Sequence, residues 1–122
     1  MPSLLAFVFL LLLPPLTAAA SEPKPSRFVG CWQSMDGTVV IEQTFRADGR
    51  FSGSTSTRGK VIWSFGGIWS LTGRQLSYVY ERSSLPQIPA GTTDQDRVLR
   101  LSRNGFTLQG SDGSLQRYKR VP

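Results

Sequence analysis

Apolar and polar side chains alternate along most of the chain after residue 27. Between residues 38 and 46, Ile41 and Phe45 fall on one face of an extended chain, and Glu42 and Thr44 fall on the other. This period of two is typical of a strand with one buried face. No segment shows the period of a helix with one apolar face, so the pattern predicts an all-β domain.

Glycine-containing turns separate the alternating segments. The turn pairs are Asp36-Gly37, Asp48-Gly49, Arg58-Gly59, Thr72-Gly73, Asn104-Gly105 and Asp112-Gly113. Asn-Gly and Asp-Gly supply the positive φ angles that tight hairpins need. The expected strands are 28–34, 38–46, 50–57, 60–71, 75–82, 96–103, 106–110 and 115–121. About eight short strands joined by hairpins predict a small antiparallel up-and-down barrel, because closure removes the exposed edges of an open sheet.

One connection is longer than the others. Residues 83–95 (SSLPQIPAGTTDQ) contain two prolines among mostly small and polar residues. Such a segment forms a loop, and we expect it to lie as a flap over one end of the barrel.

Two adjacent glycines interrupt the longest strand, within the segment SFGGIWSLTGRQLSYVY of residues 64–80. A long strand in a small barrel must bend to follow the wall, and glycine permits the bend or a bulge because it lacks a Cβ atom. The residues expected to face the interior are Gly67, Trp69, Leu71, Leu76, Tyr78 and Tyr80.

The first twenty residues have the pattern of a secretory signal peptide. A short apolar run is followed by Pro14-Pro15 and then by Ala18-Ala19-Ala20. The run is too short to span a bilayer, which takes about twenty apolar residues. We therefore expect a signal peptide at 1–20, a flexible leader at 21–27 and the barrel domain at 28–122. Export to the periplasm or the medium follows, with no membrane span after cleavage.

The chain has 14 Lys and Arg against 8 Asp and Glu, a formal net charge of +6. This balance favours anionic partners such as a cell-envelope surface, an acidic protein or an anionic small molecule. The basic residues are scattered, so nucleic acid is not an expected partner of this exported chain. A monomer is expected.

Cys31 is the only cysteine of the chain, so no internal disulfide framework can form. We expect it to be a small buried residue beside Trp32, and the alternative is an intermolecular disulfide or a reactive thiol.

The residue types argue against an enzyme, a metal site and a cofactor. The chain contains no histidine, so the usual metal-ligand sets and nucleophile–imidazole pairs are absent. Asp94 and Asp96 in the long loop resemble a sparse cation site, but two carboxylates are too few to predict one.

Arginines form the main polar group of the later strands. By strict alternation, Arg97 and Arg103 share one face of their strand and Arg100 points the opposite way. Together with Arg117 or Lys119, they would form a basic wall that binds a carboxylate or a phosphate.

Several segments resemble lipocalins and the wider calycin group. Gly30-Cys31-Trp32 matches the Gly-x-Trp motif that opens these domains. TFRADGRFSGS and GGIWSLTGRQLSYVY are similar to central hairpins of small bacterial lipocalin-like domains, and LRLSRNGFTLQGSDGSLQRYKRV is similar to their last three strands. The resemblance covers nearly all of 28–121.

The resemblance implies that Trp32 plugs one end of the barrel and packs against an arginine from a late strand, either Arg117 or Arg120. The chain lacks the C-terminal helix and the cysteine pair of a full lipocalin. Its shorter strands imply a narrower interior, which side chains could fill.

These expectations lead to a non-enzymatic lipocalin-like protein that binds a small amphipathic or anionic ligand. Its ligand-binding residues would be Trp63, Trp69, Tyr78, Tyr80, Arg97 and Arg117. A carrier of this kind needs a cavity of about 300 Å³ or more. The alternative is an envelope protein-interaction module, an inhibitor or immunity-type protein, that acts through the 83–95 loop and its basic surface.

Overall fold

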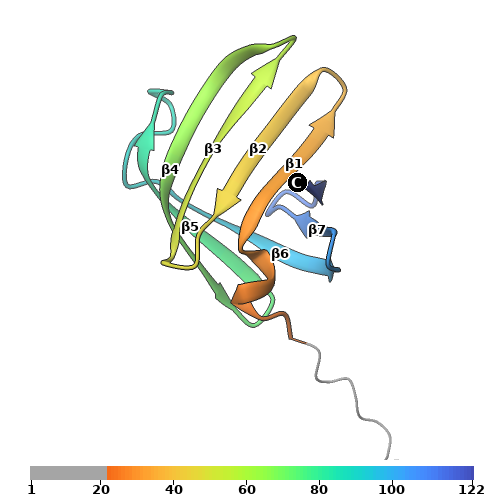
Figure 1. Cartoon of the computed structure of the whole chain (residues 1–122). Helices are drawn as coiled ribbons and strands as arrows, with labels where there is room; N and C mark the ends of the chain where they lie inside the picture. Colours follow the sequence, from red (N-terminus) through yellow and green to blue (C-terminus); the bar gives the residue numbers. More distant parts are fainter. Residues whose placement is uncertain (1–21) are drawn as a thin grey trace, which may run out of the picture.

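The computed structural model describes residues 22–122, which form a closed barrel of eight antiparallel strands (Figure 1). The strands are β1 (Gly30–Asp36), β2 (Val39–Phe45), β3 (Arg50–Thr57), β4 (Lys60–Thr72), β5 (Gln75–Ser83), β6 (Thr93–Leu101), β7 (Gly105–Gln109) and β8 (Leu115–Arg120). Each strand pairs with its neighbours in sequence, and β8 returns to pair with β1. The all-β up-and-down barrel is confirmed, and every strand boundary lies within three residues of its predicted position. The predicted signal peptide lies outside the described residues.

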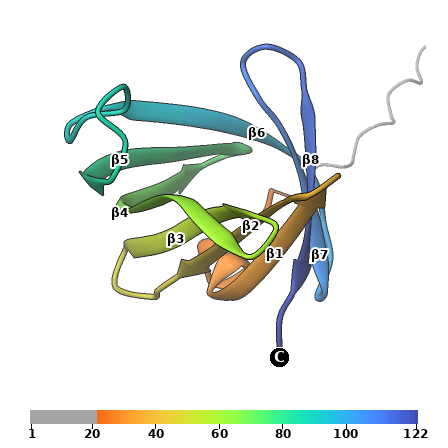
Figure 2. The same cartoon turned by 90° about the horizontal axis from the view of Figure 1, so that it is seen from above.

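The two ends of the barrel are built differently. A 3-10 helix, Pro25–Phe28, lies at one end together with the β2–β3, β4–β5 and β6–β7 turns (Figure 1). The other end carries the remaining turns and the long β5–β6 loop, and Figure 2 shows the barrel from above. We call these the closed end and the open end.

The Gly66–Gly67 pair lies at an irregularity of β4, the longest strand, which has 13 residues. The pairing of β4 with β5 shifts between these glycines, so Gly66 lies opposite Arg82 and Gly67 lies opposite Tyr80. A Cβ atom on Gly67 would collide with the carbonyl oxygen of Val79. The glycines therefore allow β4 and β5 to approach each other at a bulge, which confirms their structural interpretation.

Strand β6 differs from its prediction at both ends. It begins at Thr93, inside the segment that was expected to be a loop. Its pairing with β7 places Val98 opposite Leu108 and Arg100 opposite Thr107, so Leu99 is an extra residue. The bulge reverses the alternation, and Arg100 consequently lies on the same outer face as Arg97. The prediction that these two arginines point in opposite directions was wrong because strict alternation does not survive a bulge.

The closed end is plugged by Trp32, which is fully buried. The indole Nε1 donates a hydrogen bond to the Phe28 carbonyl at 2.8 Å, and the guanidinium carbon of Arg120 lies 4.1 Å from the indole ring centre. Arg120 is thus the arginine of the plug, and Arg117 is not. Gly30 belongs to this unit, since its φ of 136° favours glycine and a Cβ atom there would collide with the guanidinium.

The leader is partly ordered. A flexible leader was expected at 21–27; in the structure Pro25–Phe28 forms the 3-10 helix, and the Phe28 side chain is fully buried. Proline at the first position of this helix suits its fixed φ angle, and burial of the phenyl ring holds the helix against the barrel.

The core is mainly aromatic. Ten of its thirteen buried apolar side chains carry rings. Around Phe28 the ring centroids of Phe45, Trp69 and Phe106 lie at 6.3, 6.5 and 5.0 Å. Rings packed edge to face in this way give the closed end a large apolar contact area with few voids.

Cys31 is exposed, whereas a buried cysteine was expected. Successive side chains of a strand point to opposite faces, so burial of Trp32 places Cys31 on the outer face. Its sulfur accepts a hydrogen bond from the Thr44 hydroxyl at 3.3 Å.

The β5–β6 connection is shorter than expected because both flanking strands extend into it. The Tyr80 amide donates to the Thr92 carbonyl at 2.9 Å, and the Ser84 amide donates to the Ser64 carbonyl at 2.9 Å. Ile88 from this loop packs against the aromatic core. Between residues 22 and 122, no helix has the length and apolar character to cross a membrane.

We predict that Trp32→Ala and Trp69→Ala each lower the free energy of unfolding by about 3–5 kcal/mol, the usual loss for a large buried aromatic. Urea denaturation followed by far-UV circular dichroism measures this loss. Ile68→Ala is the matched control, since Ile68 neighbours Trp69 on β4 but is 42% exposed. Losses below about 1 kcal/mol for both tryptophans would contradict the assignment of the core.

Candidate functional site

The interior is filled at the closed end and hollow at the open end. The hollow is a cavity of about 180 Å³, which is smaller than the volume of about 300 Å³ that was expected for a carrier. A cavity of this size suits only a compact ligand.

One wall of this cavity comes from a row of side chains across β2, β3 and β4. Ile41 lies opposite Thr55, and Thr55 lies opposite Trp63. Residues that face each other across paired strands share one face of the sheet, so all three side chains point inward. The Trp63 indole donates to the Ser83 hydroxyl at 2.9 Å, and its ring packs at a tilt against Phe65 with the ring centroids 4.3 Å apart, which fixes the indole in the wall.

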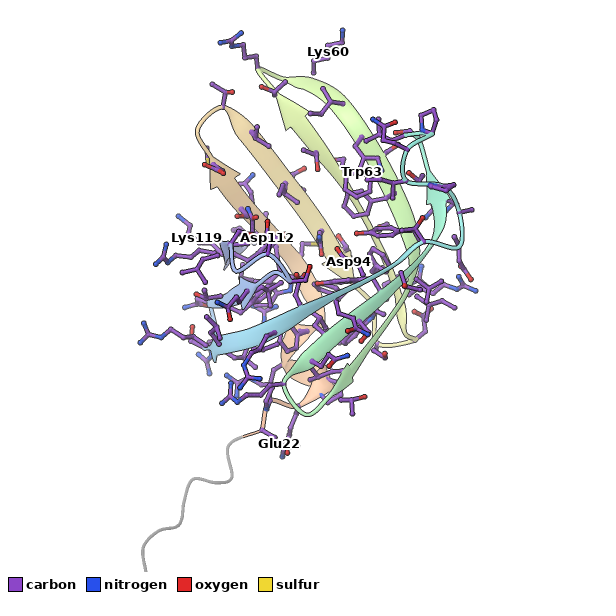
Figure 3. All side chains as sticks on the ribbon, turned by 180° about the vertical axis from the view of Figure 1, so that it is seen from behind. Glu22, Lys60, Trp63, Asp94, Asp112 and Lys119 are labelled. Carbon is purple, nitrogen blue, oxygen red and sulfur yellow. The ribbon has the colours of Figure 1, made fainter. Side chains whose placement is uncertain are left out.

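The facing wall carries two carboxylates from the start of β6. Asp94 lies opposite Tyr78, and Asp96 lies opposite Leu76. Because Tyr78 and Leu76 are buried core residues, the two aspartates are also on the inner face. Figure 3 shows Asp94, Trp63 and Asp112 in the half of the barrel that lies away from Glu22.

The environment of Asp96 favours its neutral form. Burial raises the pKa of the Asp96 carboxyl from 3.8 to about 6, and the nearby Asp94 carboxylate adds to the rise. Burial also raises the pKa values of the Tyr78, Tyr80 and Tyr118 hydroxyls. All three phenols therefore stay protonated at neutral pH.

The Tyr78 hydroxyl has no hydrogen-bond partner among the described residues, although the tyrosine is only 4% exposed. It faces the Asp96 carboxyl, and their interaction partly opposes the rise in the Asp96 pKa. The two groups nevertheless form no hydrogen bond of ordinary length and angle. A buried hydroxyl in this state is unusual in a folded protein, and it can hydrogen bond to a polar group that enters the cavity.

The structure brings together only some of the ligand-binding residues predicted from the sequence. Trp63, Tyr78 and Tyr80 line the cavity. Trp69 is buried nearer the closed end, where its indole donates to the Arg46 carbonyl at 3.0 Å. Arg97 lies on the outer face, opposite Gln75 on β5.

Arg117 lines a separate groove on the outside of the barrel. This groove has a volume of about 600 Å³ and lies over β1, β7, β8 and the end of β6. Arg100, Arg117 and Lys119 contribute positive charge to it, and Met35 and Leu101 contribute apolar surface. No carboxylate lines it, so an anionic head group fits here better than in the interior.

Both aspartates of the cavity were considered together in the sequence, but Asp94 falls in the expected loop 83–95 and Asp96 only at the first position of the expected strand 96–103. The alternation of Asp94, Asp96 and Val98 continues the buried face of β6 toward the open end, and this was the available signal. Among residues 22–122, no three His, Cys, Asp or Glu side chains lie close enough together to hold a metal ion.

We predict that Asp96→Asn stabilises the protein at pH 7 by about 1 kcal/mol, a value reduced for the partial exposure of this carboxyl. The folded pKa is raised, so between about pH 4 and pH 6 the native state holds a proton that the unfolded chain releases. The free energy of unfolding of the wild type therefore falls as pH rises through this window. The asparagine variant has no carboxyl to ionise at this position, so its free energy of unfolding falls less.

Urea titrations at a series of pH values between 3.5 and 7 measure this difference. Asp112→Asn is a control of opposite sign, because the Ser114 hydroxyl and amide lower the pKa of the Asp112 carboxyl. Equal slopes for wild type and Asp96→Asn across the window would contradict the prediction.

No protein-family model matches the chain, and no curated protein matches it significantly. Among solved structures, it is similar to a lipocalin-like protein from Bacteroides uniformis ATCC 8492, with a TM-score of 0.57 and 20% identity. The match covers 78% of this chain and 99% of that chain. The chain therefore has the lipocalin-like barrel fold that its sequence resembles.

Proposed function

We propose that this chain is an exported, non-enzymatic protein that binds a compact ligand in the open end of its barrel. The observation that carries the proposal is the cavity of about 180 Å³ with the unpartnered Tyr78 hydroxyl in its wall. Leaving a buried hydroxyl unpaired costs about 1–3 kcal/mol. A ligand that hydrogen bonds to this group recovers that free energy, which supports binding at this place.

The walls of the cavity are pre-formed. Trp63, Phe65 and Tyr80 pack against one another with ring centroids 4.3 to 5.8 Å apart. A ligand therefore has few side chains to order when it binds, which lowers the entropic cost of binding.

Binding fits the residues of the cavity better than catalysis does. A carboxyl with a raised pKa, such as Asp96, is a common feature of acid–base catalysts. A reaction also needs a nucleophile or a second group of matched pKa. The chain has no histidine, its one cysteine lies on the outer face, and the tyrosine hydroxyls of the cavity have raised pKa values.

The second candidate function is an envelope protein-interaction module, supported by the outer groove. Its cationic residues, Arg100, Arg117 and Lys119, form no ion pair among the described residues. An acidic protein surface or an anionic amphipathic molecule would complement them. Charge reversal with Arg117→Glu and Lys119→Glu abolishes such binding and leaves the interior site intact, which separates the two functions.

We predict that native mass spectrometry of protein isolated from its producing cells shows a small molecule retained by the folded chain. Thr55→Trp fills the cavity, since Thr55 lies in its wall opposite Trp63, and this variant should lose the bound mass. Ser70→Trp places the same side chain at an exposed position of β4 and should keep the bound mass. Retention by both variants would contradict an interior site.

We predict cleavage near Ala20, so that the mature chain begins at or near Ser21. N-terminal sequencing of the protein from the periplasm or the medium checks this expectation. Recovery of a chain that still begins with Met1 from the membrane fraction would overturn the export proposal.

A further inference from the structure

The interior of the barrel has the opposite charge to the chain as a whole. The chain carries a formal net charge of +6, yet no lysine or arginine lines the cavity. The charged groups in its wall are the carboxylates of Asp94 and Asp96.

The two carboxylates repel each other, and no lysine or arginine lines the cavity beside them. They lie two residues apart on one face of β6, which places their backbones about 7 Å apart. A positive charge between them would favour their ionised forms and would replace repulsion by attraction. An anion in the same cavity would meet two like charges in a partly desolvated space.

An aromatic wall adjoins these carboxylates, since Tyr78 pairs with Asp94 across β5 and β6 and Trp63 lies beyond it on β4. Trp63 and Tyr80 have ring centroids 5.4 Å apart, and Tyr80 is stacked with Tyr78 at 6.4 Å. The face of an aromatic ring carries negative potential and attracts a cation, most strongly when water is excluded. The Tyr78 hydroxyl oxygen supplies an additional acceptor for an N–H group.

We infer that the cavity is a site for a compact organic cation, an alkyl- or arylammonium group held between Asp94 and Asp96 and the aromatic wall of Trp63, Tyr78 and Tyr80. This inference rests on the proposed interior site and specifies its ligand class. The ammonium group donates hydrogen bonds to the carboxylates and to the Tyr78 hydroxyl, and its apolar part contacts the rings.

A bound metal ion is the competing occupant. Calcium takes six to eight oxygen ligands, and two carboxylates with one phenol fall well short of that number. An ammonium group needs only three acceptors, and aromatic faces suit its hydrocarbon part better than they suit a hydrated metal ion.

The test measures the affinity of three probes of one shape: benzylammonium, benzyl alcohol and benzoate. Tryptophan emission reports binding through Trp63, and calorimetry gives the stoichiometry. We expect benzylammonium to bind at least about tenfold more tightly than benzyl alcohol, and benzoate to bind most weakly. Asp94→Asn and Asp96→Asn should each remove most of this preference.

Asp36→Asn is the matched control, because Asp36 lies at the end of β1 and does not line the cavity. It should leave the preference unchanged. Circular dichroism of each variant checks that the barrel remains folded, and the Asp and Asn side chains have nearly the same shape.

The pH dependence of binding provides a second measurement. Benzylammonium stays protonated between pH 5 and pH 7.5, whereas the Asp96 carboxyl, with a pKa of about 6, does not stay ionised. The affinity of the protein for benzylammonium should therefore be lower at pH 5 than at pH 7.5 by about threefold or more. The titratable groups that face Asp96 are Asp94 on the same strand, Tyr78 and Tyr80 on β5, Tyr118 on β8 and Asp112 in the β7–β8 turn.

The outcomes separate this inference from the proposed function. Saturable binding of all three probes with equal affinity, or tightest binding of benzoate, would overturn the cation preference and leave an interior ligand site. Stronger displacement of benzylammonium by calcium than by n-butylammonium would assign the carboxylates to a metal ion and overturn the inference. Failure of all three probes to bind would contradict both the site and its selectivity.

Discussion

The contact between Trp32 and Arg120 is the interaction on which the rest of the barrel depends. These residues lie opposite each other where β1 meets β8, and only two residue pairs join those strands. The Arg120 guanidinium also donates to the carbonyls of Arg27, Val29 and Arg103 at 2.9 to 3.3 Å. One side chain thus joins the last strand, the N-terminal helix and the β6–β7 turn. Its charge is delocalised and spread over three acceptors and a ring, which makes its partial desolvation tolerable.

A gradient of polarity runs from this plug to the open end. The inner face of β2 passes from Phe45 through Gln43 to Ile41, and that of β6 passes from Val98 to the two aspartates. Burial of the aromatic groups at the closed end supplies most of the apolar contact that stabilises so short a chain. Polar groups at the open end contribute little to that stability. The division allows one end to be a packed core and the other to hold a cavity.

The sequence was sufficient for the fold because its signals are local. Alternation, the Asp-Gly and Asn-Gly turns and the Gly66–Gly67 pair each act over a few residues, and the resulting strands were placed nearly as observed. The cavity depends on register, which is a non-local property. One bulge at Leu99 moved Arg100 to the outer face, and a strand that began early turned Asp94 from a loop residue into a wall residue. The sequence also left two candidates for the arginine that packs against Trp32, and the pairing of β8 with β1 identifies it as Arg120.

The short seam between β1 and β8 has a consequence for access to the interior. Beyond Gln33 the strands no longer pair, and a side-chain hydrogen bond from Gln116 to Ser34 at 2.9 Å bridges them. Figure 2 shows the β7–β8 hairpin turning away from β1 at this place. Tyr118 of β8 belongs to the lining of both the inner cavity and the outer groove, so the two hollows meet the barrel wall at the same residue. Carboxylates lie on the inner side of the wall at this residue and cations on the outer side, so the short seam separates two surfaces of opposite charge.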